Sequence, residues 1–363
     1  MRSILMFSLI FSSLLFSQNK DSFALEFSYL NGNVLTHKKG LEHLITGHPH
    51  GFMMGFLKQS DGLKDWQQSY NYPEIGTYFL YQNFKNDFLG ENYAAGFQSN
   101  FYFFRRNFQL KTASGIAMTT NPYHKETNSK NIAFGTKFMA NLNVGLSYKT
   151  QLYKQKVAFQ TGLFFSHYSN GRIKLPNGGI NTINVNVGLV YNFSDTIQKY
   201  NDTVLTSAIK YKEPIHYNIV FRSGANQSSV VNSGQHPFYH IGFFADKRIN
   251  KKSALHLGTE LFISNFFKDF IKYQSVAYPN KNVDPNTDFK RIGIFVGHEL
   301  FFDKMSMEFQ AGYYIYQPFK FDFPIYDRIG LKYYINKKIN AGVGVKTHGF
   351  FAEALEFSVG YRL

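Results

Sequence analysis

The chain of 363 residues contains no cysteine, which excludes a disulfide framework, a thiolate metal site and a lipid-modified cysteine. It also lacks any apolar run approaching the roughly 20 residues that a membrane-spanning helix needs, and amphipathic helical periodicity is nearly absent. No transmembrane helix is therefore expected. Tryptophan occurs once, whereas phenylalanine occurs 40 times and tyrosine 25 times. Any membrane anchor must come from the fold.

The N-terminus has the composition of a targeting segment. Arg2 is followed by the almost entirely apolar residues 4–16 and by the small and polar pair Ser17 and Gln18. This order of charge, apolar core and polar end predicts a cleaved secretory signal peptide over residues 1–18. Roughly 345 residues follow, which is enough for two ordinary domains or for one large barrel.

Composition favours a membrane barrel. Aromatic residues make up 18% of the chain, yet the mean hydropathy is slightly negative. Barrel strands combine these properties because one side faces lipid and the other faces the lumen; a secreted soluble β-sandwich is the alternative. The net charge of +15 attracts phosphate groups, and behind a secretory signal the expected anionic partner is lipopolysaccharide, not nucleic acid. Solvated loop and lumen charges are the other interpretation.

Alternation of period two recurs along the chain. In residues 131–148, Leu142 and Val144 fall on one face and Asn141 and Asn143 on the other, because successive side chains of a strand point to opposite sides. The same pattern recurs over 183–193, 339–346 and 355–363. This pattern predicts an all-β fold whose strands have one apolar face and one polar face.

The alternating segments predict a transmembrane antiparallel β-barrel of about 14 to 16 strands, within the even-numbered bacterial range. The expected strands are 22–31, 50–59, 74–83, 92–105, 107–118, 131–150, 155–169, 182–193, 214–225, 237–249, 252–264, 288–301, 304–316, 324–336, 339–348 and 352–362. We expect one barrel over residues 19–363, with 194–213 as a connecting segment and 214–363 as its C-terminal strands. No internal repeat supports two equal barrels.

Connection lengths indicate which end of the barrel faces the cell exterior, because such barrels have short periplasmic turns and long outer loops. With the last strand running downward, short connections fall on the periplasmic side around Arg106, Lys154, Asn250, Asp303 and Lys337. The long polar stretches 119–130, 170–181, 226–236 and 265–287 fall on the other side. Residues 194–213 do not fit this rule, because they would form a long turn on the periplasmic side. They are either such a turn or a boundary between two halves of the chain.

One sequence motif indicates a catalytic site. The stretch from Phe165 through His167, Ser169 and Gly171, followed by residues 176–181, resembles the active-site segment of the outer-membrane lipid A 3-O-deacylase (acyloxyacyl hydrolase) family. The resemblance covers roughly residues 45–193, so 19–193 is the deacylase-like part. Residues 346–348, Glu356 and 360–362 also resemble extended, Bacteroidetes-type members of that family.

The resemblance implies that Ser169 is the nucleophile on an ester carbonyl and that His167 is its base. Residues two apart on a strand project to the same side, so the imidazole can reach and activate the hydroxyl. The resemblance also implies that Asn170, Gly171 and Asn177 shape an oxyanion pocket. The alternative for Asn170, Gly171 and Asn177 is that they are ordinary turn residues. The alternative for His167 and Ser169 is a polar pair at a strand end without catalytic function.

The third catalytic position departs from the family pattern. A glutamate is expected fourteen positions after the histidine, and this chain has Asn181. An amide oxygen can hold the imidazole in a useful tautomer but cannot offset the imidazolium charge as a carboxylate does. Strand parity places His167 on the oily outward face, and it also places Glu353 outward, on a last strand that pairs with the first in a single barrel. We therefore expect Glu353 to be a rim charge far from His167.

Metal and nucleotide sites are not expected. His43, His48 and His50 lie close together, but only Glu42 accompanies them, so we interpret them as solvent-exposed loop residues. The leading hypothesis is a cofactor-free esterase of the Gram-negative outer membrane that acts on lipid A. Its other partners are outer-membrane lipids and, through the C-terminal strand, the barrel assembly machinery. The alternative is a non-catalytic barrel, either a porin-like channel or an inactive family member.

Overall fold

The computed structural model describes residues 22–36, 38–153, 156–194, 213–349 and 351–363. The predicted signal peptide over 1–18 and most of the connecting segment 194–213 lie outside the described residues. Within the part of the chain that the structure describes, no helix is long and apolar enough to cross a membrane.

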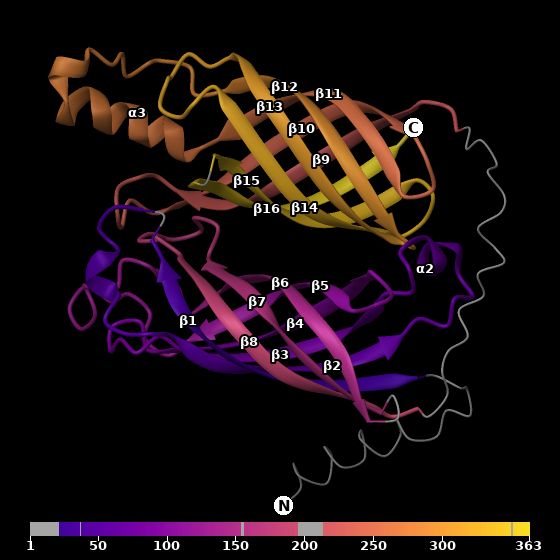
Figure 1. Ribbon diagram of the computed structural model, residues 1–363. Helices are drawn as coiled ribbons and strands as arrows, with labels where there is room; N and C mark the ends of the chain where they lie inside the picture. Colours follow the sequence, from indigo (N-terminus) through magenta and orange to yellow (C-terminus); the bar gives the residue numbers. More distant parts are fainter. Residues whose placement is uncertain (1–21, 37, 154–155, 195–212, 350) are drawn as a thin grey trace, which may run out of the picture.

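Sixteen antiparallel strands form two closed barrels of eight strands each (Figure 1). The first contains β1 (Phe23–Leu35), β2 (His50–Gln59), β3 (Glu74–Asn83), β4 (Glu91–Phe103), β5 (Phe108–Thr119), β6 (Phe138–Tyr153), β7 (Val157–Ser169) and β8 (Ile180–Asn192). The second contains β9 (His216–Gln227), β10 (Gln235–Arg248), β11 (Ser253–Ser264), β12 (Arg291–Phe302), β13 (Met305–Tyr316), β14 (Ile325–Tyr334), β15 (Ile339–His348) and β16 (Phe351–Arg362).

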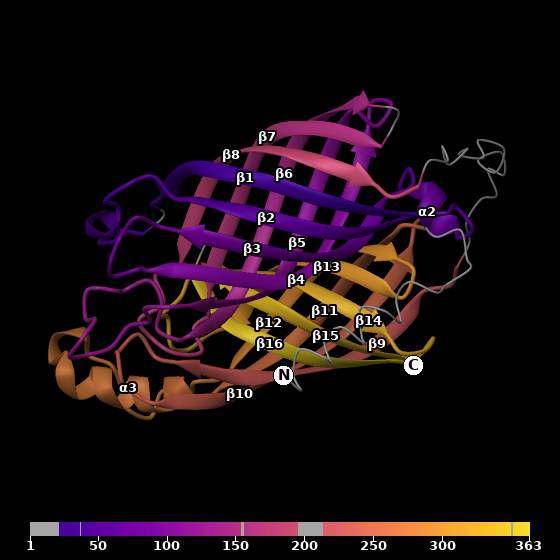
Figure 2. The ribbon, with the colours of Figure 1, turned by 90° about the horizontal axis from the view of Figure 1, so that it is seen from below.

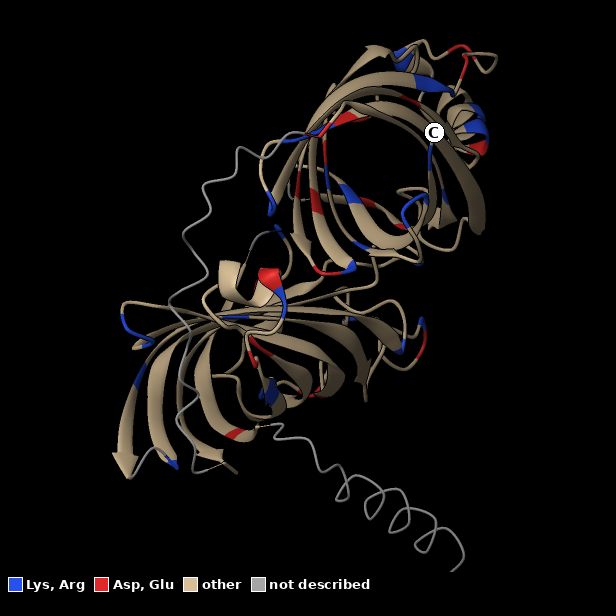
Figure 3. Ribbon diagram, turned by 90° about the vertical axis from the view of Figure 1, so that its right-hand side faces the viewer, with Lys and Arg blue, Asp and Glu red and all other residues tan. Residues whose placement is uncertain are grey.

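The barrel class and the strand count are confirmed, but residues 19–363 do not close as one barrel. β1 pairs with β8 over twelve residue pairs, and β16 pairs with β9. Figures 2 and 3 show the two barrels side by side. The break falls at residues 194–213, the one connection that was too long for a periplasmic turn. Eight strands suffice for closure, because a barrel of that size has an interior that side chains can fill.

The barrel interiors combine buried charged and polar side chains with apolar clusters, and the outer walls are apolar. In the first barrel Lys111 pairs with Glu26 at 2.5 Å, both buried; they come from β5 and β1, so the ion pair crosses the lumen. In the second, Arg222 pairs with Glu260 at 2.8 Å and with Glu308 at 3.2 Å. The outer walls expose large apolar side chains, among them Phe97, Leu146, Leu163, Leu257 and Phe357. This distribution is that of a barrel whose walls face lipid.

The two ends of each barrel differ in connection length as predicted, except that the long connection 60–73 lies at the end with the short turns. Residues 104–107, 249–252, 303–304 and 335–338 form short connections at one end, which we assign to the periplasmic side. The opposite end carries the long connections, including 170–179 and 265–290. The latter contains α3 (Phe266–Ala277) and the short η3 (Pro279–Lys281), where only a polar loop was expected. The remaining short helices are η1 (Glu42–Leu44) and α2 (Asp65–Ser69), the latter at the short-turn end.

Two sequence-based assignments fail for local reasons. The strand predicted over 131–150 begins only at Phe138, because the Asn131 side chain accepts hydrogen bonds from the backbone of Ala133 and Phe134 and so fixes a turn. Glu353 is not an exposed rim charge but is fully buried. Pairing between β15 and β16 shifts register at this point, and a bulge of this kind turns a side chain to the other face of the strand.

Candidate functional site

The predicted base stands on the outer wall of the first barrel. His167 on β7 is the cross-strand partner of Asn181 on β8, and its Nδ1 lies 2.5 Å from the Asn181 Oδ1. Their chain neighbours Ser166 and Thr182 are fully buried in the lumen, whereas Leu163, on the same face as His167, is 55% exposed. The pair therefore faces outward, near the end that carries the long connections.

The loop after β7 gathers polar groups around Ser169. The Ser169 Oγ accepts hydrogen bonds from the Asn177 Nδ2 at 3.0 Å and from the Gly171 backbone N at 3.2 Å. The Ser169 hydroxyl donates to the Asn177 Oδ1 at 3.3 Å. The Asn170 backbone N donates to the Asn177 Oδ1 at 3.1 Å. The Asn170 side chain is engaged elsewhere, with the Arg172 N and the Lys174 O. Gly171 and Asn177 thus place N–H donors at the hydroxyl, while the Asn170 side chain shapes the turn.

Gly179 lies beside both predicted catalytic residues. A Cβ built on Gly179 would lie 3.5 Å from the His167 Cε1 and 3.6 Å from the Ser169 Cβ. The backbone there has a φ of +67°, which favours glycine. Both side chains therefore border the same small space. The sequence pattern contained Gly179, but only the fold reveals this contact.

We expect Gly179→Ala to lower activity about 10²-fold, because the new Cβ would lie 3.0 Å from the Tyr168 carbonyl oxygen. The backbone between His167 and Ser169 must then shift, and small displacements of reacting groups have effects of that size. Gly349→Ala is the matched control, since Gly349 has a similar φ of +63° and nothing within 4 Å of its Cβ position. Initial rates measured on folded protein give the effect. Equal loss in both variants would contradict the intrusion argument.

The second barrel holds the loop that carries the site. The Gln227 Oε1, at the end of β9, accepts a hydrogen bond from the Leu175 N at 2.7 Å. The backbone of Gln227 exchanges hydrogen bonds with Arg172, whose Nε donates to the Gln227 O at 3.0 Å. Gly171 packs against Leu355 of β16. Sequence analysis did not predict this contact, because it joins residues more than fifty positions apart.

Arg172 is a largely buried cation at the junction of the barrels. Burial lowers the pKa of Arg172, and the carboxylates of Asp322 and Glu353 oppose that shift. Its guanidinium also lies 5.4 Å over the ring of Phe266 on α3 and donates to the Ser229 Oγ at 3.0 Å. These contacts fix the loop on the second barrel.

We expect Gln227→Ala to lower activity roughly 10-fold, the effect of one lost hydrogen bond, without unfolding either barrel. Gln151→Ala, which removes an exposed amide at the opposite end of β6, is the control. Kinetics on purified protein measure the change, and gel migration with and without heating checks the fold. A Gln227→Ala enzyme with the native rate would show that the second barrel does not position the loop.

Metal coordination is a poor fit to the acidic clusters. The described residues contain two groups with ligand-like spacing, His256 with Glu299 and Glu308, and Asp322 with His348 and Glu353. Lys332 pairs with both glutamates of the first group, while Lys346 and Arg291 pair with Glu353 in the second. Internal cations already balance these carboxylates. In the N-terminal histidine group, His43 contacts the Lys130 O and His48 contacts the Asn33 Oδ1.

Charged interiors, apolar walls and opposite ends of unequal loop length define this molecule as a membrane β-barrel protein of the bacterial outer-membrane class. Residues 50–190 match the family model described as lipid A 3-O-deacylase (PagL), and residues 215–363 match the model described as acyloxyacyl hydrolase, C-terminal domain. The chain belongs to the lipid A 3-O-deacylase family. This membership places it among the outer-membrane hydrolases of lipid A acyl esters.

Other comparisons add little. No curated protein matches the chain. A triple mutant of the Rhodopseudomonas blastica porin aligns with 8% identity, over 94% of this chain and 100% of the porin, at a TM-score of 0.19. The Acinetobacter baumannii outer membrane protein Omp33 aligns with 7% identity, over 94% and 99%, at 0.18. Scores this low carry no argument about this chain.

Proposed function

We propose that this protein hydrolyses an acyl ester of lipid A by nucleophilic catalysis, with Ser169 as nucleophile and His167 as general base. The observation that carries the proposal is that both side chains border one space at Gly179, on the outer wall. A site there meets its substrate within the outer leaflet, without extracting it from the membrane. The ion pairs across both lumens argue against an open channel.

The reaction proceeds in two halves. The Ser169 Oγ attacks the ester carbonyl while its proton passes to His167, which then gives that proton to the leaving alcohol. Water attacks the resulting acyl-serine as His167 takes its proton, and His167 returns the proton to the Ser169 Oγ as the free fatty acid leaves. With Nδ1–H donated to the Asn181 Oδ1, the lone pair that accepts the proton is on Nε2.

The donors at the nucleophile form the proposed oxyanion pocket. The Asn177 Nδ2 and the Gly171 N both reach the Ser169 Oγ, so an oxygen developing negative charge beside Oγ lies within their range. Donors placed in advance of the reaction stabilise such charge without having to reorganise. Asn170 contributes by shaping the turn, and its side chain is not a proposed donor to the substrate.

Mass spectrometry of lipid A from Gram-negative cells expressing the protein tests the proposal. We expect the mass of lipid A to fall by one acyl chain, and the change to disappear in His167→Ala. Thr161→Ala, on the same strand near its other end, is a control that leaves the site intact. Unchanged lipid A in cells that contain folded, membrane-inserted wild-type protein would contradict the proposal.

The barrel assembly machinery is the proposed partner for membrane insertion. β16 ends one residue before the C-terminal Leu363, and its outward side chains Phe357, Val359 and Tyr361 are exposed. Such an alternating terminal strand is what outer-membrane barrels present for assembly. Replacing Tyr361 and Leu363 by Ser should reduce the amount of folded protein in outer-membrane fractions. Undiminished insertion would rule out recognition through this strand.

A further inference from the structure

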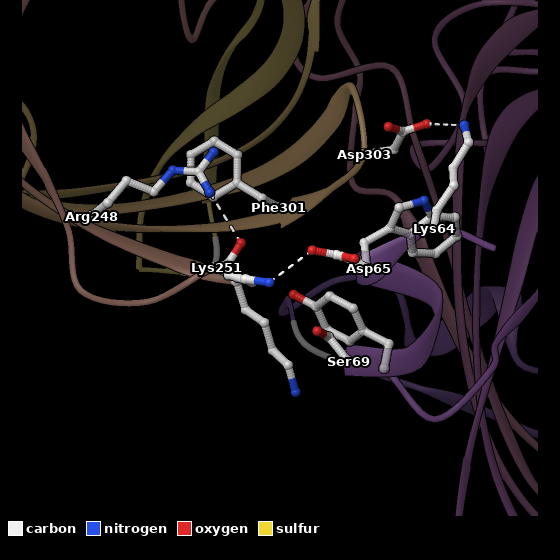
Figure 4. Close-up of a pocket in the computed structure, with 10 residues that line it drawn as sticks. Lys64, Asp65, Ser69, Arg248, Lys251, Phe301 and Asp303 are labelled. Atoms are coloured by element: carbon white, nitrogen blue, oxygen red, sulfur yellow. Dashed lines mark hydrogen bonds and ion pairs between the residues drawn. The ribbon is translucent and has the colours of Figure 1, made fainter. Parts of the chain in front are cut away.

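A cavity lies between the two barrels at the end with the short turns, at the opposite end of the barrel axis from His167. It has a volume of about 450 Å³ and takes its walls from α2 of the first barrel and from the turns at 249–252 and 303–304 of the second. Figure 4 shows side chains from both barrels around it. The cavity is lined by Lys64, Asp65, Trp66, Ser69, Tyr70, Arg248, Lys251, Lys252, Phe301 and Asp303.

Two ion pairs bridge the barrels here and leave an excess of positive charge. Lys64 pairs with Asp303 at 2.6 Å, and Lys251 pairs with Asp65 at 2.7 Å. Arg248 and Lys252 have no carboxylate at ion-pair distance among the described residues. Each lies instead over an aromatic ring, Arg248 at 3.4 Å from the ring centroid of Phe301 and Lys252 at 5.0 Å from that of Tyr70.

Three buried polar groups in the cavity wall lack hydrogen-bond partners. These are the Arg248 Nε, the Trp66 Nε1 and the Tyr70 hydroxyl, each without a partner within the described parts of the chain. A buried donor left unpaired costs free energy, and an acceptor bound in this cavity would satisfy all three. Burial raises the pKa of Tyr70 to about 12, which keeps the hydroxyl protonated and able to donate at neutral pH.

We propose that this cavity binds the phosphate headgroup of an anionic phospholipid from the periplasmic leaflet. Arg248 and Lys252, which have no carboxylate partner among the described residues, together with the donors of Trp66 and Tyr70, match a phosphodiester, which offers negative charge and several acceptor oxygens. Trp66 and Tyr70 are residue types that gather at membrane interfaces. The acyl chains would continue along the apolar outer walls of the barrels, which a free ion could not use.

The single tryptophan of the chain reports directly on this site. Trp66 lines the cavity, and no other residue contributes indole fluorescence. Titration of the purified full-length protein in detergent with phosphatidylglycerol should produce a saturable change in emission. Phosphatidylethanolamine, whose headgroup carries no net charge, should bind at least about tenfold more weakly. Inorganic phosphate should compete only at far higher concentration.

Variants separate binding in the cavity from general attraction to a basic protein. Arg248→Gln and Lys252→Gln should each weaken phosphatidylglycerol binding about 10-fold or more, as loss of a charge-assisted hydrogen bond does. Lys338→Gln, in another short turn of the second barrel, is the matched control and should bind normally. Heat-modifiable gel migration verifies folding. If one of the charge variants fails to fold, Tyr70→Phe replaces it as the variant expected to weaken phosphatidylglycerol binding.

Three results would overturn the proposal. These are unsaturated emission changes, equal binding by the Lys252→Gln and Lys338→Gln proteins, or inorganic phosphate binding as tightly as the lipid, which would assign the cavity to a free ion. Because Arg248 and Lys252 lie at the opposite end from Ser169, their variants should retain deacylation. The result is thus independent of the proposed function.

Discussion

Ser169→Ala should lower the rate of lipid A deacylation by at least about 10³-fold, because loss of the nucleophile in a serine hydrolase leaves only the contribution of binding and oxyanion stabilisation. The Ser169 hydroxyl accepts hydrogen bonds from Asn177 and Gly171, so alanine removes the oxygen of the proposed nucleophile and leaves both donors in place. Purified proteins assayed on lipid A in mixed micelles give the ratio.

The same strand supplies a matched control for this variant. Ser166 is three residues earlier on β7, but its side chain is fully buried in the lumen. Ser166→Ala should therefore fold and work normally. A Ser169→Ala protein with more than about a tenth of native activity, beside a normal Ser166→Ala protein, would remove Ser169 from the mechanism.

Asn181→Glu should raise the deacylation rate about 10-fold or more. The Asn181 Oδ1 already contacts the His167 Nδ1 at 2.5 Å, so a carboxylate at this cross-strand position would both orient the ring and offset the charge that the imidazolium acquires. Replacing such a carboxylate by an amide costs about 10⁴ in a serine protease, which leaves ample room for a gain.

Asn181→Leu provides the opposite test, because a side chain of similar size without an acceptor cannot fix the tautomer. We expect it to lose at least about 10-fold relative to Asn181, a difference typical of one important hydrogen bond. Rates at a fixed pH near neutrality order the three proteins as Glu above Asn above Leu. A glutamate variant slower than the native protein, with an intact fold, would show that Asn181 does not support the base.

Much of the fold follows from period-two alternation. The outward face of His167 and the polar lumen follow from strand parity, and the unequal ends follow from connection lengths. The closure of two separate barrels does not follow from the alternation, because the pattern of β8 is the same whether it pairs with β1 or with β9. The pairing of Leu30 with Asn186 in the first barrel is a long-range choice that no local pattern encodes. The length of 194–213 was the only local signal of a break.

The fold places the predicted site residues close together on the first barrel. The contacts from the second barrel that hold their loop were not predicted from the sequence. Cross-strand pairing of His167 with Asn181 depends on register, which alternation leaves open by steps of two. Glu353 was placed on the wrong face because a bulge inverts parity locally. The contact of Gln227 with Leu175 joins two barrels and has no sequence signature.

Covalent trapping tests the central claim most directly. A lipid phosphonate that mimics the tetrahedral intermediate, incubated with the native protein and followed by peptide mass spectrometry, should label Ser169 and no other serine. His167→Ala should greatly slow the labelling, because the hydroxyl then lacks its base. Labelling of a different residue, or labelling of Ser169 at an unchanged rate without His167, would contradict the account.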